Sequence, residues 1–353
     1  MSGETRTARI PRRVRWAAAW TLASALLVAC LLQVEWTRAL AAAASASPLR
    51  VLGAVASNLA IVPLWAAQWV LFLPRRRRIP LPRMLRITAV MAMVSNSVPF
   101  LAGQLTGFHL LARRGGVGYA ASLSVTTLDQ VAEGMAKLTL LALLGALTPL
   151  PDPLRAALLA LALAVGALLL LALAGALRHT SLRLLARRLH PRPLATAVRF
   201  VARWAQHLEG VRRPRVLVSG YGLALAMKGA EAAGILLVQT ALGVQLPPWS
   251  VLLVLAAVGL STMVAVTPGN LGVYEASAFL AYRWLGVGAE TALALAAVQH
   301  LAYLVAMGGA GWAAVTFRAL VGSRPRDVER GAAHPPGAAP LAVPPESDTA
   351  AAD

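Results

Sequence analysis

Acidic and basic side chains at helical spacing inside apolar segments are the residues of this sequence best suited to chemistry. Asp129, Glu133 and Lys137 follow one another at every fourth position, so they share one helix face and can neutralise each other. Lys228 and Glu231 are placed similarly in a second apolar segment. Charged residues in membrane segments either pair with one another or line a functional path. Two interpretations follow: charge pairs that hold a helix bundle together, or a polar path that relays protons.

A Pro-Gly break inside another apolar region is the second candidate for a functional site. Residues 266–275 read Val-Thr-Pro-Gly-Asn-Leu-Gly-Val-Tyr-Glu, in which the proline removes a backbone donor and the glycines loosen the chain. Breaks at membrane depth occur only where protein or a water-filled cavity surrounds them, and transporters place binding sites there. The half-helix that follows directs backbone N–H groups toward the membrane centre, which suits an anionic lipid phosphate. The predicted substrate-binding residues here are Pro268, Gly269, Asn270, Gly272 and Glu275.

A similar break interrupts the apolar segment 87–112. Pro99 with Gly103 four residues later matches Pro268 with Gly272, and a Gly-Val-Gly turn and a long helix follow each break. Each copy therefore contains an entering arm, a proline break, a returning arm, a glycine turn and a full helix, which predicts an inverted repeat. The predicted substrate-binding residues of this first break are Asn96, Pro99, Gly103 and Gln104.

Titratable residues that stand alone in apolar segments indicate function less strongly than the charged clusters and the breaks do. Glu275 has no close basic neighbour in the sequence, which favours a functional role over packing. His109 and His300 stand alone, so we expect each to make an ordinary hydrogen bond rather than to bind a metal. No phosphate-binding loop, metal-ligand spacing or nucleophile-and-base pattern is present, so we expect no cofactor, no metal site and no enzymatic activity.

Composition indicates a polytopic, all-helical membrane protein. Of 353 residues, 58% are hydrophobic and only 13% are charged, whereas a soluble domain has about a quarter charged residues. The net charge of +19 comes mainly from arginines, which in a membrane protein mark cytoplasmic loops and contact anionic headgroups rather than nucleic acid. Cys30 is the only cysteine, which excludes an internal disulfide.

The distribution of arginines predicts the topology. If both broken segments crossed the bilayer, the basic linker 178–215 would lie outside, against the positive-inside rule. We therefore predict two oppositely oriented re-entrant hairpins, at 87–112 and 249–284, whose tips meet near the midplane. Together with six full spans they make eight apolar segments. The six predicted spans are residues 16–34, 49–73, 119–147, 154–177, 216–242 and 289–317.

The remaining segments complete the predicted organisation. Residues 1–15 form a basic cytoplasmic N-terminus, residues 16–317 the transmembrane region, and residues 318–353 a disordered tail. Within the linker 178–215, apolar residues repeat every fourth position, which predicts an amphipathic helix on the membrane surface. We expect a multi-pass protein of the inner (plasma) membrane with both termini in the cytoplasm.

The segment 267–275 resembles the Thr-Pro-Gly-Gly-Leu-Gly-x-x-Glu signature of the flippase-like membrane domain of lysylphosphatidylglycerol synthases. The first break resembles that family's Pro-x-x-x-Gly-Glu-x-x-Arg element, with Gln104 at the Glu position and Gly107 at the Arg position. Asp129, Gln130 and Glu133 resemble its Glu-Arg-x-x-Asp element, with Gln130 in place of Arg. The resemblance implies a stand-alone domain of the kind that moves aminoacylated lipid, without the separate soluble synthase domain.

The predicted function is translocation of an anionic or modified phospholipid, or of another lipid-linked substrate. The alternatives are a small-solute or ion carrier on the same frame and a non-transporting scaffold for a lipid- or glycan-modifying enzyme. A polar groove open to lipid favours the first, a pocket closed to lipid favours the second, and dry, buried Glu275 and Asp129 favour the third. The expected partners are membrane lipids with anionic headgroups, and not nucleic acid. The oligomeric state stays open.

Overall fold

The structure is a computed structural model in which every described element is a helix. It describes residues 35–74, 79–98, 102–149, 152–188, 192–208, 213–263 and 267–322. It separates into two units, residues 1–315 and 316–353, and the second is described only as far as Gly322. The cavity and the contacts between helices described below belong to the first unit.

The helices keep the order expected from the sequence. In chain order they are α2 (Trp36–Ala44), α3 (Pro48–Leu59), α4 (Ile61–Phe72), α5 (Leu81–Ser97), α6 (Ala102–Arg113), α7 (Tyr119–Leu147), α8 (Asp152–Arg188), α9 (Arg192–His207), α10 (Pro214–Ala241), α11 (Ser250–Ser261), the 3₁₀ turn η2 (Pro268–Asn270), α12 (Val273–Trp284) and α13 (Ala289–Gly322).

Five segments of the described chain are long and apolar enough to cross a membrane. They are residues 48–72, 119–147, 155–175, 214–241 and 289–316. These segments coincide with five of the six predicted full spans, and the other predicted span, 16–34, lies outside the described residues. The segment 48–72 consists of α3 and α4, which meet at Ala60 just before Pro63, where a proline in the first turn starts a new helix.

Helices α5 and α6 form a tight antiparallel pair at the first predicted break. A Cβ atom on Gly103 would overlap Ser95, and one on Gly107 would overlap Met91, so the two glycines allow the helices to touch. The helices contain 17 and 12 residues, which corresponds to roughly 25 and 18 Å. Both are shorter than the ~30 Å hydrocarbon core of a bilayer. Pro99 lies outside the described residues.

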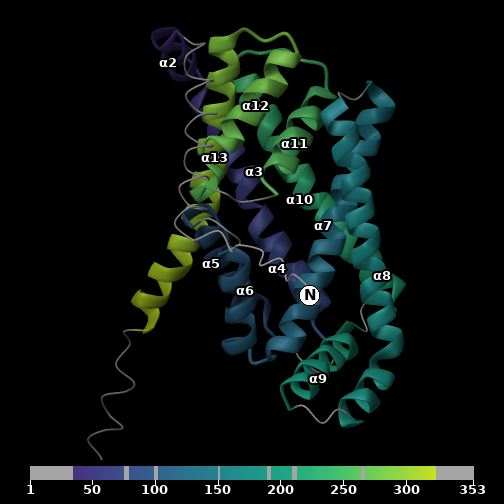
Figure 1. Ribbon diagram of the computed structural model, residues 1–353. Coiled ribbons are helices and arrows are strands. Elements are labelled where there is room, and N and C mark those ends of the chain that lie inside the picture. Colours follow the sequence, from purple (N-terminus) through teal and green to yellow (C-terminus); the bar gives the residue numbers. More distant parts are fainter. Residues whose placement is uncertain are drawn as a thin grey trace, which may run out of the picture. The chain divides into compact units, whose positions relative to one another are not determined.

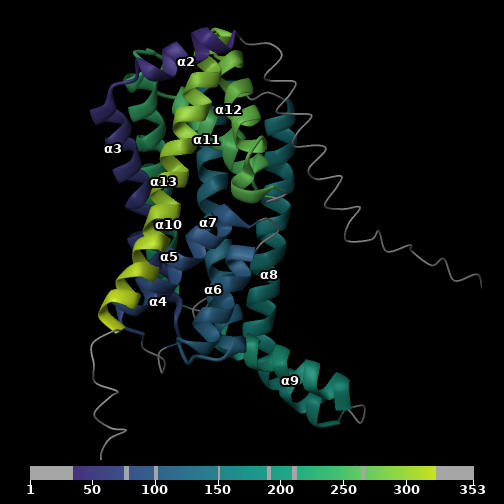
Figure 2. The ribbon, with the colours of Figure 1, turned by 90° about the vertical axis from the view of Figure 1, so that its left-hand side faces the viewer.

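Helices α11 and α12 form a second antiparallel pair at the other predicted break. Near the turn, Ser277 Oγ donates to Ser261 Oγ over 2.6 Å, and at the far end the rings of Trp249 and Trp284 are 6.2 Å apart. Each helix has 12 residues, or roughly 18 Å. The two pairs occupy opposite ends of the bundle in both views of the ribbon (Figures 1 and 2).

The basic linker is more helical than the sequence suggested. Helix α8 continues past its predicted end at residue 177 to Arg188, because strong helix formers fill this stretch and no proline occurs before Pro191. The amphipathic pattern of α9 is present, but its apolar face packs on the bundle. Ala202 and Ala205 are buried, and Trp204 Nε1 donates to Thr127 Oγ1 of α7 over 3.3 Å.

The end of the described chain also extends further than predicted. Helix α13 continues to Gly322, into the segment that we expected to begin the tail at residue 318. The remainder of the predicted tail and the predicted N-terminal segment 1–15 lie outside the described residues.

Candidate functional site

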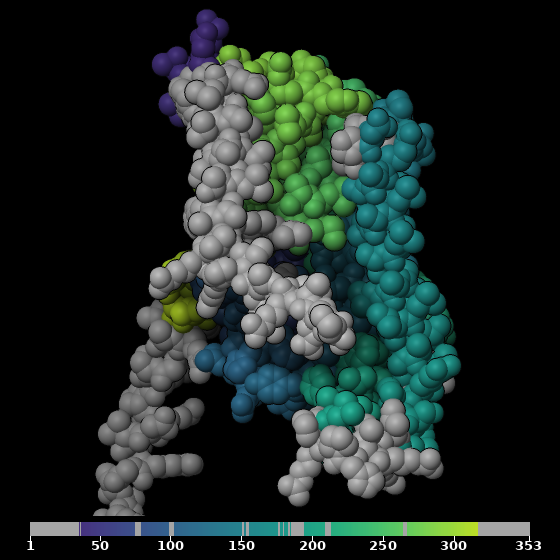
Figure 3. Space-filling model, viewed as in Figure 1, coloured from purple at the N-terminus to yellow at the C-terminus, as the bar shows by residue number. Residues whose placement is uncertain are grey.

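A polar cavity of about 240 Å³ lies where the tips of the two antiparallel pairs meet. Its wall is built by the end of α5, the start of α6, the end of α11 and Asn270, and is completed by α4, α7, α10 and α13. Val98 and Met263, one from each tip, belong to the wall and are exposed. The space-filling view shows the molecule hollowed between the green α11–α12 region and the blue α5–α6 region (Figure 3).

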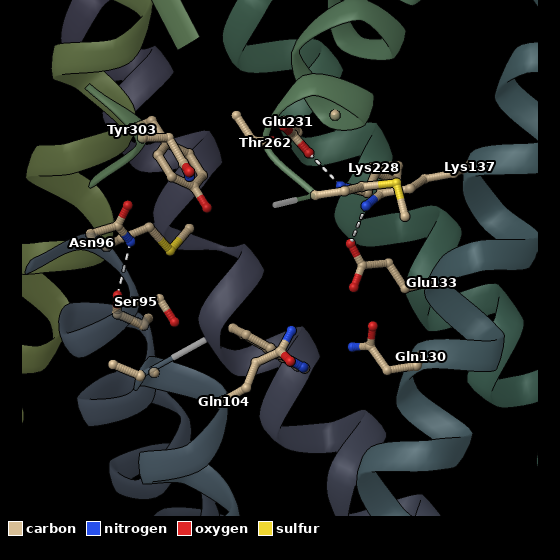
Figure 4. Close-up of a pocket in the computed structure, with 18 of the residues that line it drawn as sticks. Ser95, Asn96, Gln104, Gln130, Glu133, Lys137, Lys228, Glu231, Thr262 and Tyr303 are labelled. Atoms are coloured by element: carbon tan, nitrogen blue, oxygen red, sulfur yellow. Dashed lines mark hydrogen bonds and ion pairs between the residues drawn. The ribbon is translucent and has the colours of Figure 1, made fainter. Parts of the chain in front are cut away.

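Two ion pairs form one side of this cavity. Lys137 Nζ lies 2.9 Å from Glu133 Oε1 on α7, and Lys228 Nζ lies 2.8 Å from Glu231 Oε2 on α10. Both pairs that the helical spacing predicted therefore form. The four side chains retain between 14% and 33% of their surface, and they face Asn96 and Tyr303 across the cavity (Figure 4). Two ammonium groups and two carboxylates give this wall no net charge.

Asp129 does not join the charged wall. Its side chain is 3% exposed, and Oδ1 accepts a hydrogen bond from Trp65 Nε1 over 3.0 Å. It shares a helix face with Glu133 and Lys137, as predicted, but the lysine binds Glu133 and α4 covers Asp129. Trp65 itself lines the cavity, so Asp129 supports the wall from behind.

Glu275 is not an unpaired acid, contrary to the expectation from its sequence neighbours. Its Oε1 lies 2.7 Å from His300 Nδ1, and its Oε2 accepts the backbone N–H of Gly272 over 2.7 Å. The second contact caps α12, so the carboxylate of Glu275 occupies the helix N-terminus that we expected to receive a phosphate. The histidine is 25 residues away on α13, where local spacing gives no indication of the contact.

His300 fixes the turn between α11 and α12. Its Nε2 lies 2.9 Å from the carbonyl oxygen of Gly269, which can only accept, so Nε2 carries a proton. Tyr274 stacks on the imidazole with ring centroids 4.1 Å apart and planes 5° from parallel. His300 therefore makes the hydrogen bonds that we expected of a lone histidine, and it holds the turn and α12 to α13.

Glycines at the turn are required by both backbone shape and close approach. Gly269 has φ 59° and Gly272 has φ 83°, values that residues with a Cβ atom rarely adopt. A Cβ atom on Gly269 would lie 2.9 Å from the carbonyl oxygen of Asn96, at the end of α5. The two tips thus touch through backbone atoms.

The predicted site residues divide into two groups. The cavity wall contains Asn96, Gly103, Gln104, Glu133, Lys137, Lys228, Glu231 and Asn270. Behind or beside it lie Asp129, Pro268, Gly269, Gly272 and Glu275, which shape the wall and the turn. Among residues 267–275, the described part of the predicted break, only Asn270 lines the cavity directly. Pro99 falls outside the described residues, so its place is not assigned.

Sequence reasoning missed several residues of the wall. The additional residues include Trp65, Ser95, Thr262, Met263, Tyr303 and Met307. Tyr303 and Met307 could have been found, because they continue the helix face of His300 at intervals of three and four residues. Gln130, which replaces the Arg of the family's Glu-Arg-x-x-Asp element, also lines the cavity.

Comparison with known proteins agrees with the signature at residues 267–275. The family described as lysylphosphatidylglycerol synthase TM region matches residues 16–311, which include both antiparallel pairs and every residue of the cavity wall. A search of curated proteins found no match. The match covers most of the chain, and the protein therefore belongs to the lysylphosphatidylglycerol synthase TM region family.

Proposed function

We propose that this protein is a membrane lipid translocase of the flippase type, which handles an anionic or modified phospholipid or another lipid-linked substrate. Membership of a family tied to lipid handling supports the substrate class. One observation carries the proposal. A cavity lined by two ion pairs lies between the tips of two pairs of short helices, each shorter than the hydrocarbon core, inside an apolar bundle.

The size of the cavity suits a headgroup rather than a whole lipid. A volume of about 240 Å³ is below the roughly 300–1,000 Å³ of pockets that enclose drug-sized ligands. In this proposal the headgroup enters the cavity past Val98 and Met263 while the acyl chains stay in the bilayer. The exposed apolar side chains of these two residues at the tips suit contact with the chains.

Two ammonium groups and one helix N-terminus in the otherwise neutral wall are placed to contact a phosphate. Lys137 and Lys228 supply ammonium groups that are already held in place by their carboxylate partners. The first residues of α6, 102–104, also line the cavity, so the positive end of that helix dipole adds to the lysines. Helix α6 takes the role that we had expected of α12, whose N-terminus is capped by Glu275.

We further propose that the two helix pairs are re-entrant hairpins that enter from opposite sides of the inner membrane and meet near its midplane, as the two halves of an inverted repeat. Helices of roughly 18–25 Å at opposite ends of the bundle support this arrangement. The basic residues of 178–215 support a cytoplasmic location for that linker and for both termini.

Two other functions each have an observation in their favour. The modest volume of the cavity also suits a small solute or ion, which would make the protein a carrier. The burial of Asp129 and the pairing of Glu275 favour a scaffold for a lipid- or glycan-modifying enzyme, because neither acid faces the cavity. We assign structural roles to Asp129 and Glu275, and we propose that the two ion pairs of the cavity wall contact the ligand. In none of these roles does the protein act as an enzyme.

Reconstitution separates the three functions. Purified protein in vesicles should accelerate the movement of acyl-chain-labelled phospholipid between leaflets, measured by quenching of the label in the outer leaflet, relative to protein-free vesicles. A carrier would instead leave this rate unchanged and take up soluble glycerophosphodiesters or ions. A scaffold would do neither. Uptake of solutes without lipid movement would therefore reject the translocase.

A further inference from the structure

Asn270 has a left-handed backbone conformation, which is energetically unfavourable for a residue with a Cβ atom. Its φ is 56°, and among the described residues it is the only one other than glycine with a positive φ. L-residues avoid this region because Cβ crowds the backbone, although Asn tolerates it better than most. Residues held in such conformations cluster at binding and active sites. Asn270 also lies in the wall of the cavity.

The side chain of Asn270 carries a second cost. Its Oδ1 atom is buried and has no hydrogen-bond partner among the described residues. No other residue of the described cavity wall has such an atom. Glu133 and Glu231 are held by their lysines, and Asn96 Nδ2 donates to the carbonyl oxygen of Ala92 over 2.8 Å. A buried acceptor without a donor is unfavourable, and native structures rarely keep one without a reason.

The turn does not need this side chain. The backbone N–H of Asn270 donates to Thr267 over 3.1 Å, and Thr267 Oγ1 donates to the carbonyl oxygen of Leu271 over 2.8 Å. His300 holds the neighbouring carbonyl of Gly269. Glycine would adopt the same backbone without the steric cost and without the buried acceptor. Asparagine at this position therefore brings two costs, and no described contact within the fold offsets them.

We propose that Asn270 is a specificity-determining residue whose amide oxygen accepts a hydrogen bond from the headgroup of the ligand. The inference rests on the proposed lipid translocation and narrows its substrate class to headgroups that carry an N–H or O–H donor. A rotation of the side chain about its Cα–Cβ bond moves the whole amide from the wall into the cavity, where its oxygen can accept from the headgroup and its NH₂ group can donate to water or ligand. An ammonium or a hydroxyl satisfies it, whereas a trimethylammonium has no hydrogen to donate.

The test compares three acyl-chain-labelled lipids in reconstituted vesicles: phosphatidylethanolamine with an ammonium donor, phosphatidylglycerol with hydroxyl donors, and phosphatidylcholine with neither. The wild-type protein should move at least one of the first two about tenfold faster than phosphatidylcholine, which is the value of one good hydrogen bond. Which of the two is preferred tells ammonium from hydroxyl. The Asn270→Gly protein should lose this lipid preference. It should melt no earlier than wild type, because the substitution removes both the steric strain at positive φ and the buried acceptor without a partner.

Ser250→Ala is the matched control. Ser250 Oγ is another buried atom without a hydrogen-bond partner among the described residues, but Ser250 is not in the cavity wall. This variant should keep both the rate and the lipid preference of wild type. An Asn270→Gly protein that retains the preference, or that melts well before wild type, would show that the side chain serves the fold and would overturn the inference.

A binding measurement separates this inference from the proposed function. Glycerophosphoethanolamine or glycerophosphoglycerol should raise the melting temperature of wild type more than glycerophosphocholine does, and Asn270→Gly should abolish that difference. If wild type moves no lipid but shows this difference, the translocase is rejected and the role of Asn270 stands. If wild type moves lipid without preferring a donor-bearing headgroup, the role of Asn270 is rejected and the translocase stands.

Discussion

His300 Nδ1 on α13 lies 2.7 Å from Glu275 Oε1 on α12, and this contact closes the turn at which the α11–α12 pair reverses. Gln299, beside the histidine, extends the network, because its Nε2 donates to Tyr274 over 2.7 Å and its Oε1 accepts from Tyr282 over 2.9 Å. One face of α13 therefore holds α12 at several points. The tip that carries Asn270 is fixed to the bundle rather than left as a free loop.

Separating His300 from Glu275 should destabilise the turn. His300→Ala and Glu275→Ala each leave a buried polar partner unsatisfied, so each should lower the free energy of unfolding by about 1–3 kcal/mol. The double variant should lose less than the sum, because the two residues share one interaction. Thermal melting of the four proteins in detergent measures this coupling. Strict additivity would mean that the contact contributes nothing to stability.

An exposed ion pair provides the control for this comparison of single and double variants. Arg38 and Glu35 lie 2.9 Å apart with side chains 71% and 59% exposed, and exposed pairs contribute little. Glu35→Ala should therefore leave the melting temperature nearly unchanged.

The ion pairs of the cavity should also show coupling. Lys137→Gln leaves Glu133 charged in a mostly enclosed site, so it should lower stability by roughly 1–3 kcal/mol, less than for a fully buried pair because the cavity admits some water. Adding Glu133→Gln should recover part of that loss. Asp152→Asn is the control, since Asp152 is 96% exposed and 3.9 Å from Arg155. Expression level and melting temperature report both effects.

The contact between α5 and α6 should tolerate no side chain at Gly103. Gly103→Ala places a methyl group against Ser95 and should cost about 1–3 kcal/mol by forcing the helices apart. Gly166→Ala in α8 is the matched control. Nothing lies within 4 Å of a Cβ atom there, so the variant should be stabilised by roughly 0.5–1 kcal/mol. Equal effects of the two variants would contradict the close approach of the helices.

Topology can be tested by cysteine labelling. After Cys30→Ala, single cysteines at Arg203 in α9 and at Gln245 between α10 and α11 replace exposed residues. An impermeant maleimide applied to intact cells should label the Gln245 position and not the Arg203 position, because the positive-inside rule places the linker in the cytoplasm. The reverse pattern would invert the proposed orientation.

Periodicity and composition predicted most of the fold. Apolar lengths identified five described spans, the Pro and Gly residues marked both breaks, and the spacing of Glu133 with Lys137 and of Lys228 with Glu231 predicted both ion pairs. These features are local, because they depend on residues within a few helical turns of one another. The continuation of α8 into the basic linker as far as Arg188 was missed because the predicted span was ended at the last apolar residue, although arginine is a good helix former.

Contacts between distant segments could not be predicted in the same way. The partner of Glu275 is 25 residues later on another helix, and Trp65, which binds Asp129, is 64 residues earlier. When only residues nearby in the sequence were considered, Asp129 and Glu275 were therefore both candidates for a functional role. The packing of α9 on α7 was hidden for a similar reason, because an apolar helix face looks the same whether lipid or protein covers it.

Lipid movement by a variant without the Lys228–Glu231 ion pair of α10 tests most directly whether the cavity binds the headgroup. Lys228→Gln with Glu231→Gln removes a whole ion pair, so no single charge is left buried. Leu163→Ala, on a side chain of α8 that is 76% exposed and outside the cavity wall, is the control. The wild-type protein and the control should move acyl-chain-labelled phospholipid at equal rates, and the double variant should be at least about tenfold slower while melting within a few degrees of wild type. A folded double variant that moves lipid at the wild-type rate would contradict a headgroup site in this cavity.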